Sequence, residues 1–181
     1  MRLKGLSLQD FAVVISDYLI KNGIEVILTG GACVVIYTNN KYMSNDLDFV
    51  LISFDKQKEA KQLLTKIGFY EEDRYFKHKD TEYFIDFVPP PLSVGEEPVR
   101  EISEIIKRNC KLKLLSPTDC VKDRLAAFYH WKDRQTLMQA ILVCRDNQVD
   151  LTEVKRWSAN EGKSDEYIKF TEQLREATER D

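Results

Sequence analysis

The sequence predicts an α/β (α+β) protein whose sheet domain is followed by a helical C-terminal half. In residues 1–115, short apolar runs rich in β-branched side chains alternate with segments whose apolar residues recur at helical spacing. From residue 116 onward only the helical pattern remains. We therefore expect two regions, an α/β domain over residues 1–115 and a helical region over residues 116–181.

The first half of the chain alternates between helix and strand. Ser7 is suited to cap the first helix, and Gly23 to end it. A polar loop over residues 38–45 precedes the strongest strand of the sequence. The elements that we expect, in order, are a helix over 7–22, a strand over 24–29, a short helix over 32–37, a strand over 46–52 and a helix over 56–67.

Residues 74–78 and 82–88 predict two antiparallel strands, which the prolines at 89–91 end because proline cannot donate to a sheet ladder. Isoleucines at helical spacing predict a short helix over 100–108, and alternation predicts a strand over 110–114. Ser116 and Pro117 begin a helical half. Its expected helices span residues 117–130, 134–145, 151–160 and 164–179.

Composition excludes several classes of protein. Of 181 residues, 43% are hydrophobic and 31% are charged, which is typical of a globular protein and argues against disorder. The formal charge of −3 does not suggest a nucleic-acid coat. Four cysteines without CxxC spacing indicate a reducing compartment. With no apolar stretch of membrane-spanning length, we expect a soluble cytoplasmic protein without a membrane partner.

Asp46 and Asp48 are two residues apart on a predicted strand, so their side chains emerge from the same face. Two carboxylates this close repel each other unless a cation lies between them. Oxygen ligands on a rigid strand suit Mg²⁺, which typically takes one or two carboxylates together with substrate phosphates. A pair of solvated turn residues is the alternative, but the apolar run that follows favours the mouth of a buried strand.

Two further features extend this candidate site. Gly30 and Gly31 lie between a strand and a helix, where glycine lets the backbone approach a phosphate; a simple tight turn is the alternative. Asp86 interrupts an otherwise apolar strand, where an unpaired charge is costly. Metal binding explains the acid at this position, and an edge-strand side chain facing water is the other interpretation.

Together these motifs resemble the nucleotidyltransferase superfamily related to DNA polymerase β. The likeness covers about the first half of the chain and rests on Leu28-Thr29-Gly30-Gly31, Asp46-Leu47-Asp48-Phe49 and Ile85-Asp86-Phe87. It implies a mixed sheet with helices on one face, with Asp46, Asp48 and Asp86 as catalytic ligands of Mg²⁺ or Mn²⁺. Many members have Gly-Ser where this chain has Gly-Gly, and the interval from Gly31 to Asp46 is long for the motif.

The helical half is similar to that of small bacterial and archaeal nucleotidyltransferases, including toxins of toxin–antitoxin systems. Ser116-Pro117-Thr118-Asp119 and Lys122-Asp123-Arg124 carry this weaker likeness. It implies that a helical lysine and acid help to close the nucleotide site, with Lys122 and Asp133 as the candidates. Surface ion pairing is the alternative for each. With Gly30, Gly31 and Ser44, they complete the expected nucleotide-binding residues.

The resemblance implies transfer of a nucleoside monophosphate from an NTP such as ATP to a hydroxyl acceptor, with release of pyrophosphate. Asp86 acts as the base in this scheme. The acceptor is open: an antibiotic, an RNA end and a protein hydroxyl all fit. The competing hypothesis is a non-catalytic nucleotide-binding or regulatory module with a protein partner, such as one component of a toxin–antitoxin pair.

Overall fold

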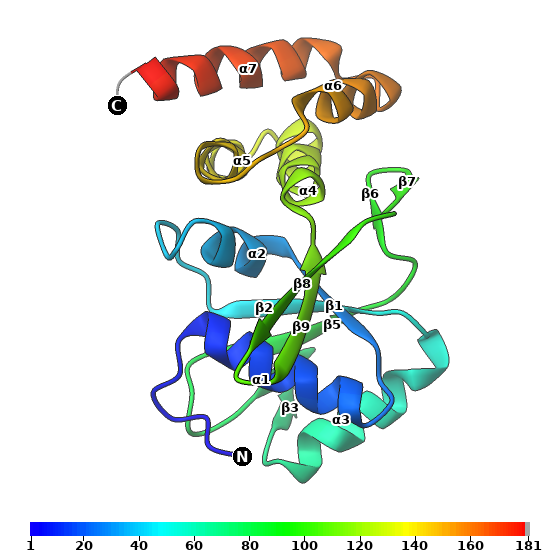
Figure 1. The fold of residues 1–181 in the computed structure, drawn as a ribbon. Helices are drawn as coiled ribbons and strands as arrows, with labels where there is room; N and C mark the ends of the chain where they lie inside the picture. Colours follow the sequence, from blue (N-terminus) through cyan, green and yellow to red (C-terminus); the bar gives the residue numbers. More distant parts are fainter. Residues whose placement is uncertain (180–181) are drawn as a thin grey trace.

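The computed structural model describes residues 1–179, in which a mixed sheet lies below a stack of helices (Figure 1). The helices are α1 (Leu8–Lys21), α2 (Gly30–Tyr37), the 3₁₀ turn η1 (Phe54–Lys56), α3 (Gln57–Lys66), α4 (Pro117–Trp131), α5 (Arg134–Asp146), α6 (Leu151–Asn160) and α7 (Ser164–Glu179). The strands are β1 (Val26–Thr29), β2 (Asp46–Leu51), β3 (Tyr70–Glu72), β4 (Tyr75–Lys77), β5 (Phe84–Val88), β6 (Ser93–Val94), β7 (Glu97–Pro98), β8 (Ile102–Lys107) and β9 (Cys110–Leu115).

The main sheet has the strand order β3-β4-β5-β2-β1-β9-β8. Strand β2 runs antiparallel to β1 and parallel to β5, and β1 runs parallel to β9. The sheet is therefore mixed, and the expected α/β class is confirmed. Its central strands carry the motifs found in the sequence, because β1 leads into Gly30 while β2 and β5 carry the three aspartates.

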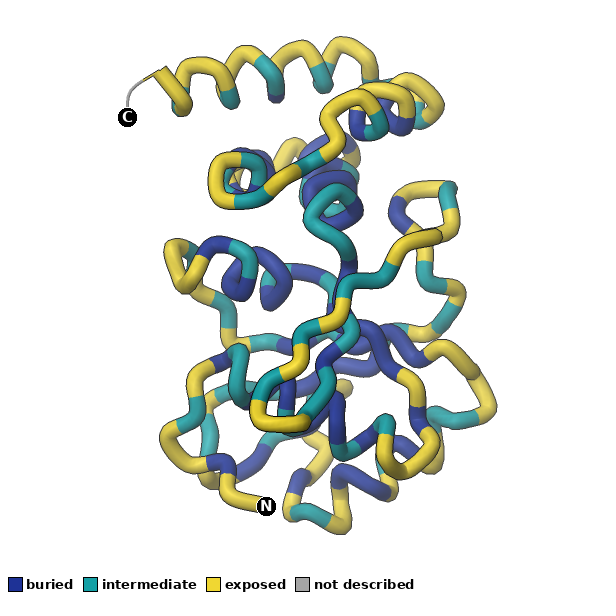
Figure 2. The backbone as a smooth tube through the Cα atoms, viewed as in Figure 1, coloured by how far each residue is buried: buried dark blue, intermediate teal, exposed yellow. Residues whose placement is uncertain are grey.

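Alternation along β2 separates a buried face from a polar one. Leu47, Phe49 and Leu51 are almost fully buried, whereas Asp46 and Asp48 on the opposite face are partly exposed. Helices α1 and α3 lie together in the lower part of the molecule, where the Tyr18 hydroxyl donates to the Leu63 carbonyl (3.2 Å). Figure 2 shows the dark-blue buried backbone along the central strands and along α2 and α4.

The helical half begins directly after the sheet. Ser116 caps α4 by accepting a hydrogen bond from the Asp119 amide (3.1 Å), with Pro117 as the first helical residue, as expected. Asp150 caps α6 in the same way. Helix α2 packs against β2 on one side and against α4 and α5 on the other, so it joins the sheet to the upper helices.

The helix expected over residues 100–108 is wrong, because this segment is strand β8. Ile102, Ile105 and Ile106 fit a helical spacing, but pairing with β9 along the whole strand overrides that local signal. Arg108 and Asn109 join the two strands, and both have positive φ (51° and 61°), as the central residues of two-residue hairpin turns require.

Three smaller differences concern element boundaries. Helix α2 begins at Gly30 rather than at residue 32. A short strand, β3, precedes β4 and turns the expected two-stranded hairpin into three antiparallel strands. The small hairpin of β6 and β7 follows the prolines, which end β5 at Val88 as expected. The remaining elements agree with the sequence predictions to within about two residues.

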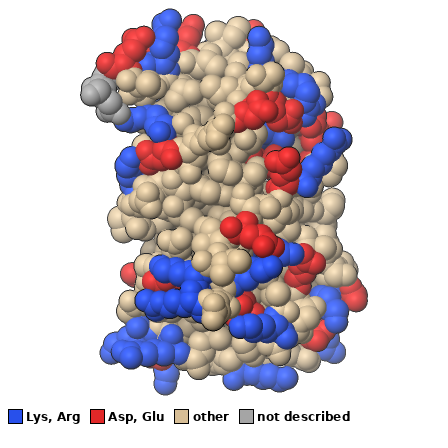
Figure 3. All heavy atoms as spheres, in the orientation of Figure 1, with Lys and Arg blue, Asp and Glu red and all other residues tan. Residues whose placement is uncertain are grey.

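Surface charge is mixed in sign. Figure 3 shows basic side chains gathered over the lower half, interspersed with acids. Lys107 pairs with Asp10 (2.7 Å) and Lys111 with Glu104 (3.2 Å), so the charges of these two lysines are neutralised. Among the described residues, no helix combines the length and the apolar character needed to cross a lipid bilayer.

Candidate active site

The three aspartates of the sequence motif occupy neighbouring central strands. In the parallel pairing of β2 with β5, Asp48 is the register partner of Asp86, and Asp46 is the partner of Phe84. Because residues two apart share a face of a strand, Asp46 and Asp48 emerge on the same side of β2 as Asp86 does on β5. Asp48 and Asp86 therefore lie side by side on the same face of the sheet.

Gly30 packs against the carboxylate of Asp48. A Cβ atom at position 30 would lie 2.3 Å from Asp48 Oδ2, and the backbone has a positive φ of 71°. Both facts favour glycine, since a side chain would collide with the carboxylate and would strain the backbone. The end of β1 is also fixed to β2, because the Thr29 hydroxyl donates to the Asp48 carbonyl (3.1 Å).

Gly31 and Ser44 form the other side of this turn. A Cβ atom at position 31 would lie 3.2 Å from Ser44 Oγ and 3.7 Å from the Tyr42 ring. The Ser44 hydroxyl donates a hydrogen bond to the Asp46 carboxylate. The polar loop before β2 thus returns to the start of α2, and Ser44 orients Asp46.

Asp86 is buried, with only 12% of its side chain exposed, and its carboxylate pairs with Arg74 (3.2 Å between Nε and Oδ2). Arg74 lies in the turn between β3 and β4 and stacks on the ring of Tyr75. The carboxylate therefore does not face open water, as the edge-strand interpretation required. Sequence reasoning missed Arg74, and its place in a turn at the end of a polar run left no signal.

The surroundings of Asp48 disfavour the ionised form of its carboxyl group. Burial, together with the negative charges of Asp46 and Asp86, raises the pKa of its carboxyl to about 6, and Arg124 acts in the opposite direction. A carboxylate in this position is costly to ionise without a nearby cation. The site therefore favours the binding of a positive charge.

The donor set fits a divalent cation that binds together with a phosphate ligand. Within residues 1–179, no group of three or more His, Cys, Asp or Glu side chains is already arranged to hold a metal ion. Asp46 is held by Ser44 and Asp86 by Arg74 instead. Carboxylates that complete a coordination sphere only with substrate oxygens are typical of Mg²⁺, whereas a preformed cage is not.

A cavity of about 540 Å³ opens beside these residues. Its walls include Thr29, Gly30, Asp48, Arg74, Asp86 and Arg124. Arg124 comes from α4 and is held by Asp123 (2.5 Å between Nη2 and Oδ2) and by Gln139 (3.3 Å). The helical half thus supplies a fixed guanidinium to the cavity. The resemblance implied a basic residue from these helices, with Lys122 as the candidate, whereas the residue that lines this cavity is Arg124.

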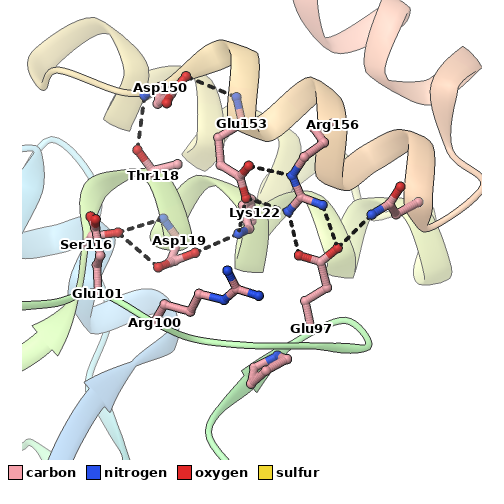
Figure 4. A pocket seen from close by; sticks show the side chains of 12 residues that line it. Glu97, Arg100, Glu101, Ser116, Thr118, Asp119, Lys122, Asp150, Glu153 and Arg156 are labelled. Carbon is pink, nitrogen blue, oxygen red and sulfur yellow. Dashed lines mark hydrogen bonds and ion pairs between the residues drawn. The ribbon is translucent and has the colours of Figure 1, made fainter.

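Lys122 lies in a separate charged cavity of about 720 Å³, bounded by α4, α6 and the segment around β7 (Figure 4). Its amine pairs with Asp119 (2.8 Å) and Glu153 (3.3 Å), and 8% of the side chain is exposed. The structure does not bring Lys122 to the aspartates. Residues two apart lie on nearly opposite sides of a helix, so Arg124 faces the aspartates and Lys122 faces away.

Asp133 lies at the rim of the site. Its carboxylate caps α5 by accepting a hydrogen bond from the Gln135 amide (2.8 Å). The Gln135 side chain donates to the Tyr42 hydroxyl (3.3 Å), and Tyr42 contacts the Gly31 position. Asp133 is thus connected to the Gly31 turn through Gln135 and Tyr42, and it does not line the cavity beside Asp48.

Sequence comparison identifies no relative, because neither a family model nor a curated protein matches the chain. Comparison of the fold finds similar solved structures. An antigenic nucleotidyltransferase-like protein from Paracoccidioides brasiliensis is similar with a TM-score of 0.60 at 16% identity, over 78% of this chain and 77% of that one.

An antibiotic adenylyltransferase and an antibiotic-resistance factor are also similar. The lincosamide antibiotic adenylyltransferase LnuA, solved with lincomycin, gives a TM-score of 0.56 at 16% identity, over 80% of this chain and 100% of that one. The antibiotic-resistance factor ANT(2'')-Ia gives 0.53 at 11% identity, over 97% and 100%. The chain therefore has the nucleotidyltransferase fold.

Proposed function

We propose that this chain is a metal-dependent nucleotidyltransferase, which transfers a nucleoside monophosphate from an NTP to a hydroxyl acceptor and releases pyrophosphate. The packing of Gly30 against Asp48, beside Asp86, supports the proposal most strongly. The Asp48 carboxylate occupies the space that any side chain at position 30 would need, directly after a strand and at the start of a helix. The fold is that of nucleotidyltransferases.

Each part of the site has a separate task in this proposal. Asp46, Asp48 and Asp86 would hold Mg²⁺ or Mn²⁺, which supplies charge neutralisation for the triphosphate. Backbone N–H groups at Gly30 and Gly31 bind phosphate oxygens, since the N-cap residue of α2 makes no side-chain hydrogen bond that would occupy them.

The chemistry then needs little covalent work from the protein. Asp86 accepts the proton of the attacking hydroxyl, whose oxygen bonds to the α-phosphorus while the bond to the leaving pyrophosphate breaks. Ser44 keeps Asp46 oriented, and Arg124 adds fixed positive charge to the wall of the cavity. Most of the rate enhancement comes from positioning and charge neutralisation.

The acceptor that we propose to test first is a small hydroxyl-bearing antibiotic. LnuA is a lincosamide adenylyltransferase and ANT(2'')-Ia is an antibiotic-resistance factor, and both have this fold. An RNA end and a protein hydroxyl are the alternatives. The competing function is a non-catalytic nucleotide-binding or regulatory module, such as one component of a toxin–antitoxin pair.

Mass spectrometry separates these functions. The protein is incubated with each NTP, Mg²⁺ and one acceptor class at a time, and acceptors are examined for the mass of a nucleoside monophosphate. Transfer by the wild type but not by Asp86→Asn supports the enzyme, because the amide cannot accept the proton. Metal-dependent nucleotide binding without transfer to any acceptor class favours the module, and absence of binding contradicts both.

A further inference from the structure

Arg74 and Arg124 are the two basic residues that line the cavity beside Asp48 among the described residues. They differ in how firmly they are held. The Arg124 side chain is 16% exposed and is fixed by Asp123 and Gln139. The Arg74 side chain is 70% exposed and rests on Tyr75, with its guanidinium carbon 4.9 Å from the ring centroid. Arg74 is therefore the cation that can move.

The single acid that Arg74 contacts in the cavity is Asp86 (3.2 Å). The residue before it, Asp73, has a positive φ of 57°, which places the arginine in the tight turn between β3 and β4. The Arg74 guanidinium occupies Oδ2 of Asp86, where it competes with a divalent cation for the carboxylate and opposes the transfer of a proton to it. Binding of a metal–nucleotide complex therefore has to displace Arg74 from Asp86.

Besides Asp86, the acids Asp48 and Asp123 line this cavity. Asp123 already pairs with Arg124, and Asp48 is a metal ligand in the proposed function, so phosphate is the remaining anionic partner for a displaced Arg74 guanidinium. The phosphate turn at Gly30 lines the same cavity as Arg74, so phosphate oxygens bound to the turn lie within that space. The planar guanidinium forms two parallel hydrogen bonds to phosphate, and such charge-assisted pairs are stronger than neutral hydrogen bonds. We propose that Arg74 exchanges Asp86 for the polyphosphate of the bound nucleotide and so clamps it.

This inference rests on the proposed function, and it adds a residue and a movement to it. The clamp holds Asp86 neutralised while the site is empty, and it releases Asp86 only when a cation and a polyphosphate arrive together. Arg74 then contributes to nucleotide affinity in the presence of Mg²⁺ and not in its absence. A surface ion pair without function predicts no such dependence on metal.

Calorimetric titration of ATP and of pyrophosphate, each with Mg²⁺ or with EDTA, tests the clamp. The variants are Arg74→Ala and Arg74→Lys, and Lys77→Ala is the matched control. Lys77 lies on the same hairpin, pairs with Glu72 and does not line the cavity. Thermal unfolding of each variant confirms that it is folded.

We expect Arg74→Ala to weaken binding of both ligands about tenfold or more with Mg²⁺, the scale of a charge-assisted hydrogen bond, and to leave binding in EDTA unchanged. Arg74→Lys should bind both ligands with intermediate affinity, since lysine keeps the positive charge but lacks the paired donors of the planar guanidinium. Equal or tighter binding by folded Arg74→Ala would overturn the clamp while leaving the proposed function intact. A folded wild type that does not bind Mg²⁺–ATP would overturn both.

Discussion

Replacement of Gly30 by alanine separates backbone strain from damage to the site. Alanine at a φ of 71° costs about 1–2 kcal/mol relative to glycine. Its Cβ atom would also lie 2.3 Å from Asp48 Oδ2, and real Cβ atoms rarely come within 3.0 Å of another heavy atom, so the carboxylate must move by at least 0.7 Å (3.0 minus 2.3). Rotating a side chain away from its preferred rotamer adds roughly 0.5–1.5 kcal/mol.

Gly23 is the matched control for this change. It has a φ of 80°, and a Cβ atom there would meet nothing within 4 Å. Gly23→Ala should therefore lose about 1–2 kcal/mol of unfolding free energy and keep full nucleotide binding. Gly30→Ala should lose about 1.5–3.5 kcal/mol and lose Mg²⁺-dependent ATP binding, because the displaced Asp48 carboxylate no longer faces the cavity.

Urea unfolding and calorimetric ATP titration measure the two effects. In the double variant Gly30→Ala, Asp48→Ala, the collision is absent, so its unfolding free energy should be higher than the sum of the two single effects predicts. Equal unfolding free energies for Gly30→Ala and Gly23→Ala, together with normal ATP binding by both, would refute the reasoning. The Asp48 carboxylate would then not need the space at position 30.

Three further predictions concern stability without ligand, measured by chemical unfolding. Asp48→Asn should raise the unfolding free energy at pH 7 by roughly 1–3 kcal/mol but change it little at pH 4. The reason is that the pKa of Asp48 is raised to about 6, so the ionised carboxylate destabilises the folded protein at pH 7. A lower unfolding free energy of the variant at pH 7 would contradict this. Ser116→Ala should cost about 1 kcal/mol through the lost α4 cap, and no change would show the cap to be unimportant. Arg156 lowers the pKa of Glu97 and Glu153 to about 2, so their stabilisation is present above about pH 4.5 and is lost as the pH falls toward 2. Arg156→Ala should flatten that acid dependence, and an unaltered profile would argue against the ion pairs.

The local sequence pattern was sufficient to predict most helices and strands and to place the three aspartates on strands. Asp46 and Asp48 could be placed on one face of a strand because strand alternation fixes it. The pairing of Asp48 with Asp86 depends on β2 and β5 being neighbours, which the register shows and local sequence pattern does not predict. The caps Ser7 and Ser116 were predictable because each satisfies backbone groups only a few residues away.

The failures have a shared physical cause, because each depended on tertiary placement. Ile102 and its neighbours fit a helix until β9 offers a pairing partner. Lys122 and Arg124 are equally plausible from sequence, and only the rotation of α4 against the sheet decides which one faces Asp48. Arg74 reaches Asp86 from a turn whose position depends on β3, a strand too short and too exposed to be recognised.

Calorimetric titration of ATP with and without Mg²⁺, on the wild type and on the double variant Asp46→Ala, Asp48→Ala, tests the central claim most directly. We predict saturable binding to the wild type that requires the metal and is absent in the folded double variant. Binding of equal strength in both proteins, or binding that EDTA does not weaken, would contradict the assignment of these aspartates to a metal–nucleotide site.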